Sequence, residues 1–295
     1  MANLKEIKRK IGSVKNTQKT TNAMKLVSSA KLKRTEELAK RSRVYAAKLT
    51  ELINEIAQKM QKNNAEGIDN VYFKENRNPK KVDIIFITAD KGLCGGFNAQ
   101  TIKRVNKLIS EYKAQDTKVR LRAIGRKGID YFRFNGIELN NEIVGLSAAP
   151  DYKTASEFIS EVADSYVNGE TDKIILVHNG YVSMISQEIR EDQVLPVDSS
   201  KLQLNAVSTS ELEVEPDDDD TLLDALVKRY VEYTMYYSLI DSLAAEHSAR
   251  MQAMDAATKN AKEMVKTLTV KYNKARQEAI TTELIEIISG MESMK

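Results

Sequence analysis

The chain has 295 residues, of which 42% are hydrophobic and 29% are charged, and its formal net charge is +3. This length admits one to three domains with packed cores. A single cysteine, Cys94, excludes an internal disulfide framework and suits a reducing compartment. No apolar run approaches the roughly 18 residues that cross a bilayer, and the first residues lack the apolar core of a signal peptide. We therefore expect a mature protein without direct membrane insertion.

The charge is distributed unevenly. Residues 1–50 contain 14 Lys and Arg against three Glu, a balance of +11, so the other residues together carry −8. Such a basic segment predicts an anionic neighbour: nucleic acid, lipid headgroups or acidic protein loops. Because basic helices joined to coiled coils bind the major groove of DNA, a coiled-coil nucleic-acid-binding protein is one alternative. Against it, these basic residues lie on a helix that also carries an apolar stripe.

The first predicted element is a long helix over residues 2–62, which contain no proline and one glycine, Gly12. Its first apolar residues follow the 3-4 spacing of one helix face, and residues 15–21 are then polar all round. The apolar positions before this polar interval are Leu4, Ile7, Ile11 and Val14, and those after it are Ala23, Met24, Leu26, Val27, Ala30, Leu49, Leu52, Ile53 and Ile56. The pattern predicts a helix whose buried stripe has a polar interval.

The middle of the chain alternates between strand and helix patterns after a linker over residues 63–81. The expected strands are Val82–Thr88, Lys118–Ile124, Ile137–Ile143, Lys173–His178 and Ser183–Leu195, with one more edge strand within Gln203–Val214. The expected helices are Asn98–Tyr112, a short one from Gly125 through Phe132, and Pro150–Val167. This alternation predicts βαβ units on a largely parallel sheet, in a three-layer, Rossmann-like α/β domain.

The last predicted element is a second long helix, because neither proline nor glycine occurs between Pro216 and Gly290. About 70 helical residues would extend roughly 100 Å. The aspartates of residues 217–220 suit the start of this helix, where carboxylates complement the helix dipole. Apolar residues at the tip, among them Ile280, Leu284 and Ile288, predict an apolar socket for it.

This second helix carries an apolar stripe of nearly heptad spacing, which predicts a left-handed supercoil with a partner helix. The stripe is Leu226, Tyr230, Tyr233, Tyr237, Ile240, Ala244, His247, Met251, Met254, Thr258, Ala261, Val265, Leu268, Tyr272, Ala275 and Ala279. Both termini can therefore form a long antiparallel two-helix coiled coil, with the α/β domain between them. We expect residues 1–75 and 215–295 to be the two coiled-coil helices and residues 76–214 the central domain.

No motif predicts an active site, a cofactor or a metal. The glycine-rich turn over residues 88–98 lies between a strand and a helix, but its spacing matches neither phosphate-binding fingerprint, so we interpret it as a tight turn. Cys94 has no histidine close in sequence. The two histidines, His178 and His247, are not accompanied by clustered carboxylates.

Four stretches resemble the gamma subunit of F-type ATP synthases, in the same order along the whole chain. They are Ile7–Lys33, Asp90–Asn98, Ala249–Thr258 and Tyr272–Gly290. One departure is Met291, since the family usually has alanine after the last motif. The resemblance implies a rotor shaft inside a ring of alternating alpha and beta subunits, with an α/β domain that contacts the epsilon subunit and the membrane c-ring. It also implies that the nucleotide sites belong to the ring, so this chain has no catalytic set of its own.

Matching positions imply contacts with these partners. Met24, Arg250, Gln277, Thr281 and Glu283 match residues that the family uses for coupling between shaft and ring, although simple coil packing is an alternative role for Met24. The resemblance further implies that Arg276 pairs with a carboxylate of the beta subunit and that Glu215 lies at the epsilon contact. Acidic beta-subunit loops then become the partners of the basic segment. The chain lacks the cysteine-containing segment of chloroplast members, so we expect a peripheral location at the cytoplasmic face of the bacterial inner membrane.

Overall fold

The computed structural model describes residues 4–63, 70–73, 76, 78–197 and 219–294, without side-chain surroundings for residues 54–63 and 219–222. The chain divides into two compact units. The first, called here the terminal unit, consists of residues 1–29 and 250–295, and the second, called the sheet unit, consists of residues 30–249. The two long helices contribute to both. The helices and strands in chain order are α1 (Leu4–Asn63), η1 (Val71–Phe73), β1 (Lys81–Ile87), α2 (Phe97–Ala114), β2 (Lys118–Ile124), α3 (Arg126–Phe134), β3 (Asn141–Ile143), α4 (Tyr152–Val167), β4 (Lys173–Tyr181), β5 (Gln187–Leu195) and α6 (Asp219–Glu292).

The sheet unit contains one five-stranded sheet with the order β3-β2-β1-β4-β5. The first four strands run parallel, and β5 is antiparallel to β4. The central strand β1 is buried from Val82 to Ile87 because both of its faces are covered, as is usual for parallel sheets. Its one buried charge, Asp83, is paired with Arg120 and Arg122 of β2. The predicted α/β domain on a largely parallel sheet is confirmed. The predicted additional edge strand within Gln203–Val214 lies outside the described residues.

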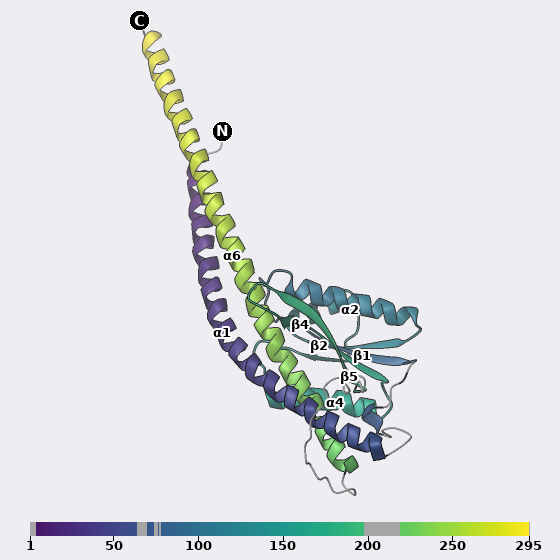
Figure 1. Ribbon diagram of the computed structural model, residues 1–295. Helices are drawn as coiled ribbons and strands as arrows, with labels where there is room; N and C mark the ends of the chain where they lie inside the picture. The colour runs from purple at the N-terminus through teal and green to yellow at the C-terminus, as the bar shows by residue number, and fades with distance from the viewer. Residues whose placement is uncertain (1–3, 64–69, 74–75, 77, 198–218, 295) are drawn as a thin grey trace. The chain divides into compact units, whose positions relative to one another are not determined.

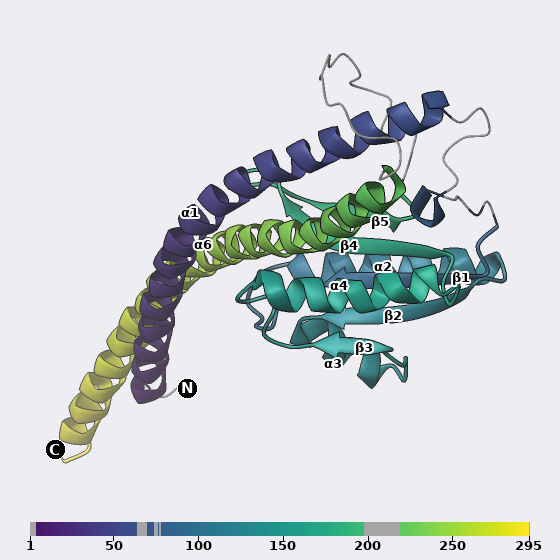
Figure 2. The ribbon, with the colours of Figure 1, turned by 90° about the horizontal axis from the view of Figure 1, so that it is seen from below.

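Helices cover both faces of the sheet, giving three layers. Figure 1 shows the sheet between α2 and α4, and Figure 2 shows the same layers from below. On one face, Ile84 and Phe86 of β1 pack against α2 and α3. On the other face, Ile85 and Ile87 pack against α4 and α6, and Ile53 of α1 joins that core. Successive side chains of a strand point to opposite faces of the sheet, so β1 contributes residues to the hydrophobic cores on both faces.

Two glycines allow the loop after β2 to approach β1 closely. A Cβ atom on Gly125, whose φ is +99°, would lie 1.8 Å from the Thr88 carbonyl oxygen, and one on Gly128 would lie 2.5 Å from the Phe86 ring. Only glycine fits at such contacts. The loop that packs this closely on the sheet is therefore the one that contains Gly125 and Gly128.

In the sheet unit, α6 uses a second apolar row that the predicted stripe does not contain. The predicted Tyr230, Tyr233 and Tyr237 are only half-buried. The residues that α6 buries in the core under the sheet recur every four positions, and they are Leu223, Val227, Val231, Met235 and Leu239. The stripe prediction for this segment was therefore incomplete, because a helix that contacts both a sheet and another helix needs two apolar faces.

Candidate coupling surface

The terminal unit is a pair of antiparallel helices formed by the first part of α1 and the last part of α6 (Figure 1). The Thr258 hydroxyl lies 2.8 Å from the Thr21 hydroxyl, and the Lys25 ammonium lies 2.6 Å from Asp255. A step of four residues forward along α1 thus corresponds to a step of three residues backward along α6. The predicted antiparallel pairing of the two ends of the chain is confirmed in this unit.

On α6, the stripe predicted for the terminal unit is the one that the structure covers. Every third or fourth residue from Met254 to Ala279 is half-buried or buried, while the residues between them are mostly exposed. The covered positions are Met254, Thr258, Ala261, Val265, Leu268, Tyr272, Ala275 and Ala279. These spacings are those of a helix pair that buries one narrow stripe per helix.

On α1, the prediction needs a correction. The covered positions continue through the polar interval, where Gln18 is half-buried and Thr21 and Ser28 are buried. Leu26 and Val27, which we expected on the buried stripe, are 62% and 57% exposed. Three smaller or more distant members of the expected stripe are exposed as well, and they are Ala23, Ala30 and Leu52. The reason is the geometry of the helix. From Thr21 the stripe steps to Lys25 and Ser28. Because successive residues are rotated by about 100° around the helix axis, Leu26 and Val27 point away from this row. Polar residues thus occupy the contact, and large apolar residues face outward.

A charged group joins the two helices beside this polar stretch. Asp255 accepts hydrogen bonds from Lys25 and lies 2.8 Å from Lys259, one turn further along α6. The hydrogen bond from Lys25, followed by that from Lys259, lowers the pKa of Asp255 from 3.8 to about 2. A specific pair of this kind favours one alignment of the two helices over its neighbours.

The candidate contact residues lie at different depths in this unit. Met24 and Arg250 are half-buried, on α1 and α6 respectively. The candidates toward the end of α6 are all exposed, and they are Arg276, Gln277, Thr281 and Glu283. The Thr281 hydroxyl donates to the Gln277 carbonyl oxygen at 2.9 Å, so those two residues occupy adjacent turns. Glu215 lies outside the described residues.

The end of α6 extends past the first described residue of α1. The register of the two helices places Leu4 near Ala275, and every described residue after Ala279 is exposed. Figure 1 shows this last stretch of α6 without a helix beside it. Large apolar side chains on this stretch are at least half exposed, and they are Ile280, Leu284, Ile285, Ile287, Ile288 and Met291. An exposed apolar group of this size indicates a binding surface.

The sequence reasoning missed Leu26 and Val27 as surface residues. They follow Met24 on α1 and add apolar area to an otherwise basic helix surface. The signal was available, because continuing the 3-4 spacing from Val14 through Gln18 and Thr21 leads to Ser28 and excludes both residues. Leu26 and Val27 therefore extend the candidate surface next to Met24.

In the sheet unit, the crevice at the carboxyl ends of the strands is occupied by a side chain of the protein itself. This is where doubly wound folds bind phosphates, often on a helix N-terminus. Asp90 follows β1. Its carboxylate accepts a hydrogen bond of 2.9 Å from the backbone amide of Arg126, which is the first residue of α3. It also accepts from the Gly145 amide at 3.0 Å and the Ser147 hydroxyl at 3.2 Å. The amide that would receive an anion is thus already paired with a carboxylate.

The cysteine and the histidines lie in packed environments. Cys94 is buried against Phe97 and α6. His178 and His247 are buried, and the Nε2 atom of His178 lies 3.3 Å from Asp241 on α6. Within the described ranges, no group of three or more metal-ligating side chains occurs, and no helix is long and apolar enough to span a membrane. These side chains serve packing between the sheet and α6.

A family model described as ATP synthase matches residues 3–294. The chain is 84% identical over its full length, and over the full length of the relative, to the ATP synthase gamma chain of a Sulfurovum strain. The identity to the gamma chain of a Nitratiruptor strain is 60%, again over the whole of both chains. The chain belongs to the ATP synthase gamma-chain family.

Solved structures agree with this membership in the family. A chain of the central stalk and c-ring of Tetrahymena thermophila mitochondrial ATP synthase matches with a TM-score of 0.61 and 25% identity, covering 81% of this chain and 99% of that chain. A rotor chain of Euglena gracilis mitochondrial ATP synthase has the same fold, with a TM-score of 0.64, 17% identity and coverage of 94% and 98%. None of these relatives supports the nucleic-acid-binding alternative.

Proposed function

We propose that this chain is the central rotor shaft of an F-type ATP synthase and couples proton flow through a membrane c-ring to ATP synthesis or hydrolysis in an alpha/beta ring. The observation that carries the proposal is the end of α6, where exposed apolar residues continue beyond the first described residue of α1. A helix end without a neighbouring helix is only marginally stable in water. Its exposed apolar side chains would be buried if it were bound in an apolar socket. In the complex, the ring supplies that socket.

The same proposal assigns partners to the two units. The terminal unit contacts the alpha and beta subunits through Met24, Arg250, Gln277, Thr281 and Glu283. Arg276 pairs with a beta-subunit carboxylate, and the basic surface of α1 faces acidic loops. Screened surface ion pairs contribute only about 0–1 kcal/mol each, which suits an interface that must slide. The α/β domain contacts epsilon and the c-ring, with Glu215 at the epsilon contact.

Three further assignments follow from this role. The chain has no catalytic activity of its own, because the ring contains the nucleotide sites. It is a peripheral component at the cytoplasmic face of a bacterial inner membrane. Its parts are the coiled-coil helices of residues 1–75 and 215–295 and the central domain of residues 76–214.

Reconstitution tests the proposed role. The purified chain is expected to hydrolyse no ATP alone and to restore ATPase activity to isolated alpha and beta subunits from the same source. ATP hydrolysis by the purified chain alone, or no effect on alpha and beta subunits, contradicts the proposal. Co-purification with alpha, beta and epsilon subunits from membranes provides an independent readout.

The role of Met24 in coupling has its own test. Met24→Lys is expected to lower ATP-driven proton pumping relative to ATPase activity, because an added ammonium can pair with a beta carboxylate and resist rotation. Met24→Leu is the matched control, since it keeps the apolar volume and is expected to pump normally. The ratio of pumping to hydrolysis in membrane vesicles measures the effect. An unchanged ratio in Met24→Lys vesicles, with normal assembly, removes Met24 from the coupling surface.

A further inference from the structure

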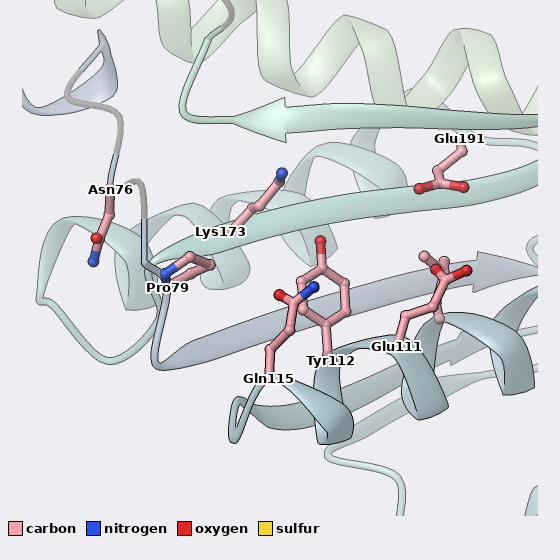
Figure 3. Close-up of a pocket in the computed structure, with 8 residues that line it drawn as sticks. Asn76, Pro79, Glu111, Tyr112, Gln115, Lys173 and Glu191 are labelled. Carbon is pink, nitrogen blue, oxygen red and sulfur yellow. The ribbon is translucent and has the colours of Figure 1, made fainter.

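A pocket lies in the sheet unit where the second half of α2 meets the edge of β4 and β5 (Figure 3). Its volume is about 330 Å³. Pockets for small molecules start at about 300 Å³, so this one suits a small ligand. Helix α2 contributes Glu111 and Tyr112, Gln115 follows its last residue, β4 contributes Lys173 and β5 contributes Glu191. This group of five residues is called here the α2 pocket.

One end of the α2 pocket contains two carboxylates, Glu111 and Glu191, which neighbouring cations hold in place. Lys107 lies 3.7 Å from Glu111. Arg104 binds Glu191 through its Nε atom at 2.7 Å and reaches Glu111 at 3.4 Å through Nη1. Both contacts of Arg104 to Glu191 use the same oxygen, Oε2, so Oε1 keeps its capacity to accept hydrogen bonds. The two carboxylates are therefore positioned before any ligand arrives, which reduces the entropy lost on binding.

The middle and the other end of the α2 pocket carry hydrogen-bond donors. In Figure 3, the Tyr112 hydroxyl points into the space between Lys173 and the two carboxylates. Neither the Tyr112 hydroxyl nor the Lys173 ammonium has a hydrogen bond to another described residue. Burial, followed by the charges of Glu191 and Glu111, raises the pKa of Tyr112, so its hydroxyl remains a donor at neutral pH. The pocket thus has acceptors at one end and donors at the other.

We propose that the α2 pocket binds a small zwitterion, with its ammonium group on Glu111 and Glu191 and its carboxylate on Lys173 and Tyr112. A ligand with only positive charge would meet Lys173, and a ligand with only negative charge would meet the two glutamates. Opposite charges at the two ends of one molecule match both sets of residues, and charge-assisted hydrogen bonds are the stronger class. This site is separate from the proposed rotor role and does not depend on it.

Isothermal titration of the full-length chain with three matched probes tests the proposal. The probes are 6-aminohexanoate, hexylamine and hexanoate, which share a six-carbon chain and differ in charge. Only 6-aminohexanoate is expected to bind saturably at concentrations up to about 10 mM, enough to saturate a site with a Kd of ~1 mM. No saturable binding of 6-aminohexanoate, or equal binding of either singly charged probe, overturns the proposal.

Variants place the binding in the α2 pocket. Lys173→Met and Glu191→Gln are each expected to weaken 6-aminohexanoate binding by about tenfold, the effect of one lost charge-assisted hydrogen bond. Lys113→Met is the matched control, because Lys113 is an exposed lysine of α2 that does not line the pocket. Circular dichroism establishes that each variant is folded. Unchanged affinity in both pocket variants, or equal weakening in Lys113→Met, contradicts the assignment.

Discussion

Two stretches of the same helix, α6, have opposite environments. Residues 238–249 in the sheet unit are buried at every position, including polar ones such as Asp241 and Ser248. Residues 280–292 in the terminal unit are exposed at every position, including apolar ones such as Leu284 and Ile288. In sequence, both stretches satisfy the same requirements for a helix. The comparison teaches that helix formation and burial are separate properties of a segment.

The buried stretch is stabilised by paired polar groups as well as by apolar packing. Asp241 accepts from Arg190 at 2.7 Å, contacts the His178 ring at 3.3 Å and accepts from the Tyr181 amide at 3.3 Å. These contacts join α6 to both β4 and β5. The exposed stretch shows only hydrogen bonds within its own helix, such as that from Thr282 to Glu278. Its apolar area is therefore available to a partner.

The largest expected effect breaks the buried polar group. Asp241→Ala is expected to destabilise the chain by about 3–5 kcal/mol, because Arg190 and His178 would lose their partner in a buried site. Urea unfolding followed by circular dichroism measures the loss. Asp241→Asn is the control, since its amide oxygen still accepts one hydrogen bond and a smaller loss is expected. Equal stability of Asp241→Ala and the unmodified chain contradicts the structural role of these contacts.

A matched pair of leucines on α6 compares the two stretches directly. Leu239→Ala is expected to cost about 2–5 kcal/mol of unfolding free energy, because Leu239 is fully buried under the sheet. Leu284→Ala is expected to change it by less than about 0.5 kcal/mol, since Leu284 is 54% exposed. The same urea titration measures both. Similar losses in the two variants contradict the distinction between the stretches.

In the complex, we expect the exposed Leu284 to matter for activity although it matters little for the stability of the isolated chain. Leu284→Ser should leave the isolated chain folded and lower the ATPase activity that the chain restores to alpha and beta subunits. The physical reason is the loss of apolar area at the proposed socket, at about 25 cal/mol for each Å² no longer buried. A titration of the variant against a fixed amount of alpha and beta subunits measures the effect. Full activity at the same subunit ratio excludes Leu284 from the contact.

The smallest expected effect concerns pH and the helix pair of the terminal unit. The pKa of Asp255 is depressed in the folded chain to about 2 from 3.8, so the carboxylate stabilises the folded state above pH 4 and this contribution is lost as the pH falls toward 2. Asp255→Asn lacks this contribution. The difference in urea midpoint between the unmodified chain and Asp255→Asn is therefore expected to shrink between pH 4 and pH 2. A difference that stays constant over this range contradicts the assigned pKa.

Much of the fold could be predicted because its signals are local. The strand and helix alternation from Val82 to Leu195 depends on hydrophobic periodicity and on glycine-containing turns, both of which can be recognised in a single sequence. The length of α6 followed from the absence of proline and glycine before Gly290. The candidate contact residues came from resemblance, and their role in coupling remains a prediction. For Glu215, the prediction lies outside the described residues.

The sequence by itself determined the two long helices, the parallel sheet between them and the buried stripe of α6 from Met254 to Ala279, because each depends on the spacing of neighbouring residues. Only the tertiary structure decided that Leu26 and Val27 face outward, that Asp90 occupies the crevice at the strand ends, and that α6 buries a second row from Leu223 to Leu239. Each of these features depends on which other part of the folded protein packs against the helix segment or side chain. A burial stripe needs a partner surface, and the identity of that surface is not encoded in local periodicity.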